Sequence, residues 1–109
     1  MKTINLGEVL ASRTVRFQPA VGAAVDVVVS LGMPVSDDDG RDWVCPFQIS
    51  GIGDEPVRGV FGIDKMQALV LALHVLPTEL RAIAQEESGA FPNCDEDLGL
   101  TRACSMYLR

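Results

Sequence analysis

Four segments with the apolar patterning of β-strands follow one another between Ala11 and Ile63, and no helical segment separates them. Short stretches rich in Gly, Pro and Asp connect the four segments, and such residues favour turns. Parallel neighbouring strands need a crossover of about a dozen residues or more, which is usually a helix. The element order therefore excludes a parallel sheet. It predicts an α+β fold in which a four-stranded antiparallel meander is covered on one face by a C-terminal helix.

Alternation of side chains gives each predicted strand one face directed at the core. The second segment shows this most clearly, because Asp26 and Ser30 fall on the face opposite its apolar residues. The one-sided sets are Ala11, Val15 and Phe17, with Arg13 among them; Val25, Val27, Val29 and Leu31; and Trp43, Cys45, Phe47 and Ile49. Val57, Phe61 and Ile63 supply the fourth strand. Pro46 lies on the opposite face of the third strand and cannot donate to a ladder. This strand is therefore expected at an edge of the sheet or with a bulge.

One long apolar segment follows the strands and has helical periodicity. Asp64 is a good N-cap, and Gln67 three residues later is placed to complete a capping box. One stripe of the helix collects Leu69, Ala72, Leu73, Leu76, Leu80 and Ile83. Pro77 removes a helical hydrogen bond, which predicts a kink there or a split into two helices. The helical region is expected to end near Ser88-Gly89.

Size and composition indicate one globular domain. The chain has 109 residues, of which 48% are hydrophobic and 22% are charged. Neither half alone would bury enough surface to offset its chain entropy, so residues 1–109 are expected to form a single domain. No apolar run approaches the ~20 residues of a membrane-spanning helix, and no membrane partner is predicted. Residues 90–109 fit a helix or a strand, and we expect an extended tail or an added strand.

The charge balance bears on the kind of partner. Nine Lys and Arg residues stand against fifteen Asp and Glu residues, which gives a formal net charge of −6. This charge repels phosphate backbones and the basic residues occur singly, so nucleic-acid binding is not expected. An acidic domain attracts basic proteins, although the same charge also serves solubility alone.

The cysteines favour a reducing compartment. The chain has three cysteines, Cys45, Cys94 and Cys104. Their number is odd, and their spacings match no common disulfide framework. The first residues lack the apolar stretch of a secretory leader. A cytoplasmic location is therefore expected, with Cys45 as a small core residue. Spacing does not decide whether Cys94 and Cys104 meet.

Metal and nucleotide motifs are incomplete. Placing Gly40 at the sixth position of a calcium loop puts Val35 first and Pro46 twelfth, where oxygen ligands belong. Gly51 and Gly53 begin like a dinucleotide loop, but a proline stands where the third glycine belongs. No Cys or His pair has the close spacing of zinc ligands. No metal and no cofactor are predicted.

The sequence contains no recognisable catalytic motif. His74 is the single histidine, and no local serine or cysteine signature accompanies it, so we expect a packing or surface role for it. Acid–base catalysis by two carboxylates that are distant in the sequence but adjacent in the fold stays open as an alternative. No catalytic residue is predicted, and a non-enzymatic role is favoured.

Two linked motifs resemble a family of small bacterial domains of unknown function. Asp42–Ile49 contains a W-x-C-P-[FY]-x-I strand, and Gly62–Leu69 contains G-x-D-x-x-Q-A-L at the start of a helix. Asp97-Leu98-Gly99 matches a later Asp-Leu-Gly segment of the same family. The resemblance covers roughly residues 24–100. It implies a bacterial, cytoplasmic α+β domain, and it implies no activity and no catalytic residues.

The predicted helix carries more apolar residues than one sheet-facing stripe needs. Val70, Leu71 and Val75 point away from that stripe, and His74 is the single polar residue between Ala68 and Leu76. A helix in a two-layer domain normally has a polar outer face. We therefore predict an interaction surface formed by Val70, Leu71, His74 and Val75. The C-terminal tail and a second copy of the chain in a symmetric dimer both remain open as its cover.

Two functional hypotheses follow from these observations. The first is a protein-interaction domain, of which a toxin-neutralising immunity protein is one concrete version. The second is a small-ligand-binding protein or enzyme, with a site between sheet and helix near His74 or Asp64.

Overall fold

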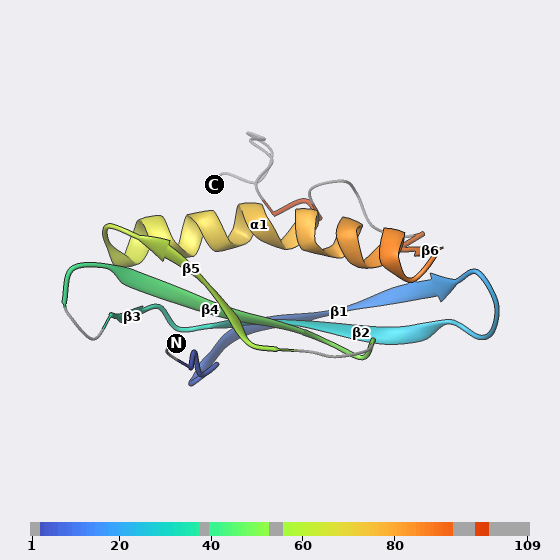
Figure 1. Cartoon of the computed structure of the whole chain (residues 1–109), viewed down its shortest axis with the longest axis horizontal. Coiled ribbons are helices and arrows are strands. Elements are labelled where there is room, and N and C mark those ends of the chain that lie inside the picture. Colours follow the sequence, from blue (N-terminus) through green and yellow to red (C-terminus); the bar gives the residue numbers. More distant parts are fainter. Residues whose placement is uncertain (1–2, 38–39, 53–55, 93–97, 101–109) are drawn as a thin grey trace, which may run out of the picture.

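The computed structural model describes residues 3–37, 40–52, 56–92 and 98–100. A β-sheet forms one layer and a single helix lies across one of its faces (Figure 1). The elements are β1 (Val9–Pro19), β2 (Val25–Gly32), β3 (Val35–Ser36), β4 (Trp43–Ser50), β5 (Arg58–Gly62), α1 (Lys65–Glu86) and β6 (Gly89–Ala90). The predicted α+β fold is confirmed.

The strand order confirms the predicted meander. The pairs β1–β2, β2–β4 and β4–β5 are all antiparallel, so the four main strands are neighbours in chain order. Two short strands were not predicted. β3 continues the line of β2 along β4, and β6 pairs with the last two residues of β1. Strands of two residues carry no alternation from which sequence patterning could identify them.

Pro46 lies in an interior strand, at an irregularity of the ladder. Leu31 pairs with Phe47, and the next pair on that side of β4 is Val35 with Val44. Three residues separate these pairs on the β2–β3 side and two separate them on β4, so the extra residue lies in the break between β2 and β3. On its other side β4 pairs with β5 in regular register, with Pro46 opposite Gly59. The predicted edge position is therefore wrong, and the irregularity beside Pro46 belongs to the neighbouring strands and not to β4.

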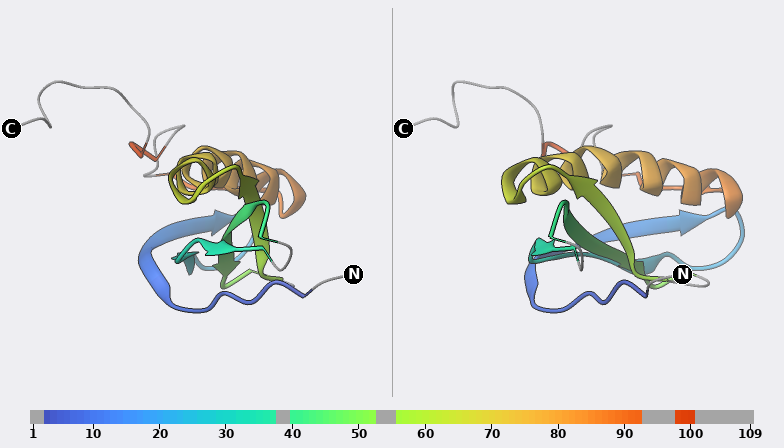
Figure 2. Two further views of the ribbon diagram at one scale, coloured as in Figure 1. Left: turned by 90° about the vertical axis from the view of Figure 1, so that its left-hand side faces the viewer. Right: turned by 60° about the vertical axis from the view of Figure 1, so that its left-hand side comes forward.

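The core lies between the sheet and α1. Its buried members are Val15, Phe17, Val27, Val29, Leu31, Cys45, Phe47, Ile49, Ala68, Ala72, Leu76, Leu80 and Leu98. The N-terminal segment lies on the opposite side of the sheet from α1 (Figure 2). Ile4 in this segment stands so close to Gly59 of β5 that a Cβ on Gly59 would meet its Cδ1 at 3.0 Å. This contact covers part of the second face of the sheet, where Val44 and Pro46 are buried.

β5 turns Val60, and not Phe61, towards the core. Val60 pairs with Cys45 and is half-buried against the core, whereas Phe61 pairs with Val44 and is exposed. Directly paired residues point to the same face of a sheet, so the pairing decides the facing. Phe61 belongs to the strand, as predicted, and lies on the face away from the core. Val57 and Ile63, which were predicted in the same strand, lie just outside its ends, and Ile63 is exposed.

Asp64 caps α1 as predicted. Its Oδ1 accepts a hydrogen bond from the backbone N–H of Gln67 at 2.7 Å. The Gln67 side chain accepts from the N–H of Ile63 at 2.8 Å, one residue before the position that a capping box uses. The N–H of Gln67, one of the orphan donors of the first helical turn, is satisfied in this way, and the second bond fixes the residue before the cap.

The helix is continuous through Pro77. It runs over 22 residues with Pro77 inside, so the predicted split into two helices is wrong. Ala68, Ala72, Leu76, Pro77 and Leu80 are buried, and they lie in and around the predicted stripe. The proline ring is buried, which offsets part of the cost of the missing hydrogen bond.

The length and apolar character of α1 differ from the expectation that no segment approaches a membrane-spanning helix. Lys65–Glu86 is long and apolar enough to span a membrane. Length and composition alone carry this result, and a core helix meets the same criterion. In this fold the buried stripe of α1 packs on the sheet, and 28% of the apolar stretch of the helix is buried.

The end of α1 returns the chain to β1. The helix ends at Glu86, close to the predicted position, and Ser88 takes a left-handed conformation with φ 52°. β6 (Gly89–Ala90) follows at once, at the place where the helix was expected to end and before most of the segment for which an added strand or extended tail was expected. Leu98 is buried, and its carbonyl oxygen accepts a 2.7 Å hydrogen bond from Nη1 of Arg13. The rest of the predicted tail, with Cys94 and Cys104, lies outside the described residues.

Candidate functional site

The predicted interaction surface lies on the outer side of α1. Val70 and Leu71 are 43% and 38% exposed, His74 is exposed and Val75 is half-buried. Leu98 and Leu100 pack beside Leu73 and Leu76 on the flank of the helix that faces β1, and together they line a small cavity there. The described part of the tail therefore covers a neighbouring flank and leaves Val70 and Leu71 exposed.

A more exposed apolar surface lies where β5 leads into α1. We call Phe61, Ile63, Met66 and Val70 the apolar corner. Phe61 lies with Val44 on the sheet face turned away from α1, whereas Met66 and Val70 lie on α1, so the corner follows the chain round the end of the sheet. Their exposed fractions are 50%, 73%, 74% and 43%. Met66 and Val70 are one helical turn apart and share a face of α1. Sequence reasoning missed this surface because the pattern of the fourth strand did not show which face Phe61 and Ile63 take, while Met66 carried no periodic signal of its own.

Polar groups flank the apolar corner at the same end of the molecule. Asp42 directly precedes β4, and the pairing of Trp43 with Gly62 brings it beside Ile63. Asp64 and Lys65 follow in the chain. The ammonium of Lys65 lies over the ring of Trp43, 5.3 Å from its centroid, so this cation is already engaged.

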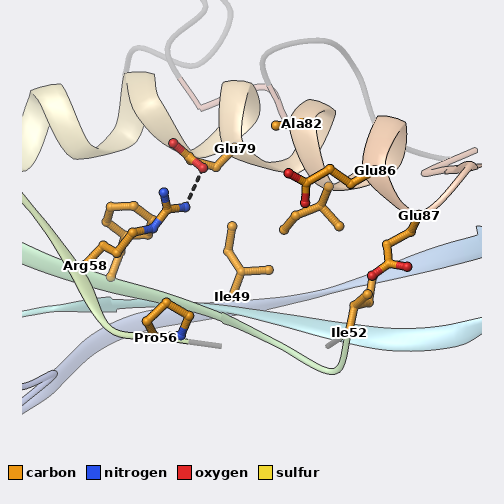
Figure 3. A pocket seen from close by; sticks show the side chains of 10 residues that line it. Ile49, Ile52, Pro56, Arg58, Glu79, Ala82, Glu86 and Glu87 are labelled. Carbon is orange, nitrogen blue, oxygen red and sulfur yellow. Dashed lines mark hydrogen bonds and ion pairs between the residues drawn. The ribbon is translucent and has the colours of Figure 1, made fainter. Parts of the chain in front are cut away.

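A cleft opens between the C-terminal half of α1 and the sheet (Figure 3). It has a volume of about 350 Å³. Its apolar lining includes Phe47, Ile49, Ile52 and Ile83. The second functional hypothesis placed a site between sheet and helix, and the structure has a cleft there. It does not lie near His74 or Asp64, which are not among its lining residues.

The lengths of three elements explain why this cleft exists. β5 begins at Arg58, opposite Phe47, so it covers only the first five residues of β4. β4 continues to Ser50. The helix extends over this longer part of the sheet, where β5 no longer lies beside β4. Space is therefore left between the helix and the sheet beyond the start of β5.

Charged groups stand along the cleft. Arg58 forms an ion pair with Glu79, and its guanidinium lies 5.2 Å from the centroid of the Phe47 ring. Glu86 and Glu87 line the same cleft from the end of α1. In Figure 3 the helix supplies the glutamates from one side, while Arg58, Ile49 and Ile52 come from the other. Among the described residues, neither Glu86 nor Glu87 has a cationic partner.

Cys45 is a core residue, as predicted. It is fully buried and free, and its Sγ donates to the carbonyl oxygen of Gly32 at 3.5 Å. Burial raises the pKa of its thiol to about 11. A thiol with a raised pKa is a poor nucleophile at neutral pH, which argues against a catalytic role for Cys45.

Within residues 3–37, 40–52, 56–92 and 98–100, no three His, Cys, Asp or Glu side chains are grouped so that they could hold a metal ion. The glutamates of the cleft are therefore spread along it, and their chemistry is that of a charged rim rather than a metal centre.

Comparison with known proteins gives one match. A protein family described as a domain of unknown function (DUF6968) matches residues 11–102. The matched range contains both of the motifs described above. It supports membership of an uncharacterised domain family, and the role of the two motifs as the family's signature stays a prediction. No curated protein and no solved structure matches the chain.

Proposed function

Because the chain belongs to the DUF6968 family, whose description assigns no activity, we propose a function from its surface: it is a non-enzymatic domain that binds a basic protein through the apolar corner. The exposure of Phe61, Ile63, Met66 and Val70 is the observation that carries this proposal. Four large apolar side chains from adjoining elements face solvent there. Burying them against a partner is favourable by about 25 cal/mol for each Å² removed from water.

The composition of the corner is typical of an interface core. Aromatic residues and methionine are enriched in such cores, and charged residues are depleted. Phe61 and Met66 supply these residue types, and Met66 adds a flexible side chain that adapts to a partner surface. Val70 connects the corner to Leu71 and His74, so the surface predicted from the sequence adjoins it on α1.

Charge supports a basic partner. The chain carries a formal net charge of −6, and Asp42 and Asp64 stand beside the corner, where Lys65 is held over Trp43. A partner with apolar side chains ringed by Lys and Arg complements this arrangement and is steered towards it. An immunity protein that neutralises a basic toxin is one concrete form of the proposal. The proposed setting is the bacterial cytoplasm, and the free, buried thiol of Cys45 is consistent with it.

Affinity capture with paired variants tests this function. The tagged chain is used as bait in cells of its source, and proteins that co-purify are quantified by mass spectrometry. Met66→Lys places a charge in the middle of the corner. Val21→Lys is the matched control, because Val21 is 91% exposed in the turn between β1 and β2. Both positions are exposed, so both variants are expected to keep the melting temperature of the wild type.

The expected result is one basic protein that wild type and Val21→Lys retain and that Met66→Lys loses. The purified pair should also bind more weakly as salt rises. The proposal is wrong if wild type retains no partner, if Met66→Lys retains it as well as Val21→Lys does, or if the retained partner is acidic.

A further inference from the structure

The cleft beneath the end of α1 has the size and the chemistry of a small binding site. Its volume of about 350 Å³ lies in the lower part of the range of small-molecule pockets, roughly 300–1,000 Å³. Most such pockets combine an apolar lining with a few polar groups that orient the ligand. This cleft has both, and it lies away from the apolar corner. It does not depend on the function proposed above.

The apolar part of the cleft is contributed by both layers of the fold. Ile49 and Ile52 come from β4 and the turn after it, and Ile83 comes from α1. Ile49 is buried, while Ile52 and Ile83 are partly exposed towards the cleft. Phe47 is also in the lining, but the guanidinium of Arg58 lies over its ring. The three isoleucines therefore form the surface that an apolar ligand body would contact.

The charged groups of the cleft do not cancel. Arg58 is neutralised by its ion pair with Glu79. Glu86 and Glu87 remain, and no described residue pairs with either carboxylate. Figure 3 shows both on the helix side of the cleft, with Ile52 opposite Glu87. The end of the cleft nearest the helix C-terminus is thus negative, and the helix dipole adds to this potential.

We propose that this cleft binds a small organic cation, namely an amine with an apolar body. The apolar body lies against Ile49, Ile52 and Ile83, and the ammonium lies between Glu86 and Glu87. An anion would face two unpaired carboxylates at the rim. A neutral molecule of the same shape would gain only the apolar contact, so the charge provides the selectivity.

Binding of 2-phenylethylamine to the full chain tests the proposal, with amide chemical shifts followed by NMR. The neutral 2-phenylethanol and the anionic 3-phenylpropionate are the matched probes. We expect saturable shifts at Ile49, Ile52 and Ile83 with the amine, at least about threefold weaker binding of the alcohol, and none of the acid. The assignment is overturned if the amine gives no saturable shifts there, or if the alcohol binds equally well.

Two variants locate the charge. Glu86→Gln combined with Glu87→Gln is expected to weaken amine binding at least about threefold. The control combines Glu8→Gln with Asp26→Asn, which removes the same total charge from exposed positions outside the cleft lining and should leave binding unchanged. Equal effects of the two double variants would show attraction by net charge alone and overturn the site.

One further variant and one further probe remove the remaining ambiguity. Ala82→Trp fills the cleft from an exposed helical position and should abolish binding while the melting temperature is kept. Retained binding in Ala82→Trp would contradict the location. Nα-acetyl-lysine methylamide mimics a lysine of a polypeptide. Tighter binding of this probe than of 2-phenylethylamine would overturn the assignment to a small-molecule amine, because the cleft would then prefer the lysine side chain of a polypeptide.

Discussion

At the scale of single residues, the end of α1 shows a division of roles between Ser88 and Gly89. A glycine most often takes the left-handed position that ends a helix. Here Ser88 takes it, with φ 52°. Gly89 is needed elsewhere, because a Cβ on it would meet Cζ of Phe17 at 2.3 Å and the carbonyl oxygen of Gln18 at 2.5 Å. Close packing of β6 on β1 therefore excludes a side chain at position 89 and leaves the backbone strain at Ser88.

This division predicts opposite effects of two substitutions. Ser88→Gly should stabilise the fold by up to about 1 kcal/mol, because glycine adopts positive φ without steric cost. Gly89→Ala should destabilise it by about 1–3 kcal/mol through overpacking against Phe17. Urea unfolding of both variants beside wild type measures the two differences. A destabilised Ser88→Gly, or a neutral Gly89→Ala, would contradict the geometry at this helix end.

At the scale of secondary-structure elements, the sequence was sufficient for the order and the pairing of the main strands. Their alternation placed Val27, Val29, Cys45 and Phe47 in the core. It failed at β5, where two glycines interrupt the pattern and the facing depends on its pairing with β4. It also left the effect of Pro77 open. That outcome depends on how well the ring packs against the sheet, and a helical pattern carries no such information.

Pro77→Ala is expected to stabilise the protein by about 1 kcal/mol. Alanine restores an N–H that can bond to the carbonyl of Leu73, and proline inside a helix costs about 3 kcal/mol relative to alanine. Loss of the buried ring and greater freedom of the unfolded chain offset roughly 2 kcal/mol of this gain. Denaturant unfolding measures the balance.

Thr78→Ala is the control for Pro77→Ala, since Thr78 is exposed on the same helix and its substitution changes helix propensity alone. A net loss of stability in Pro77→Ala would mean that packing of the ring outweighs the missing hydrogen bond.

At the scale of the whole molecule, the cleft and the apolar corner could not be located from the sequence. The cleft exists because β5 is shorter than β4 while α1 covers both, and these relative lengths appear only once the register is known. Glu79 then pairs with Arg58, which is distant in the chain, and Glu86 and Glu87 line the same cleft. The surface on α1 was predicted in part, since Val70 and Leu71 are exposed there and Val75 is half-buried.

One contact joins the two ends of the described chain. Arg13 interrupted the apolar pattern of the first strand without an evident reason, and in the structure it donates to the carbonyl of Leu98. Arg13→Ala should therefore increase amide exchange in a peptide that contains Leu98–Leu100. The expected loss of global stability is about 1 kcal/mol.

Hydrogen exchange with mass spectrometry measures the effect of Arg13→Ala. Arg16→Ala is the matched control, because Arg16 forms an exposed ion pair with Asp26 on the other face of the sheet. Equal exchange at Leu98–Leu100 in the two variants would contradict an anchoring role for Arg13.

The late position of β6 and Leu98 in the chain affects how the protein folds during its synthesis on the ribosome. Among the described residues, β6 pairs only with Gln18 and Pro19, and Leu98 comes 85 residues after Arg13. At synthesis rates of about 5–20 residues per second, roughly 4–17 s pass between the appearance of these two residues. During that interval the end of β1 at Gln18 and Pro19 has no partner on this edge, and the apolar flank that Leu98 later covers is open to another nascent chain. Rapid or crowded expression is therefore expected to favour aggregation during translation over aggregation of the finished fold.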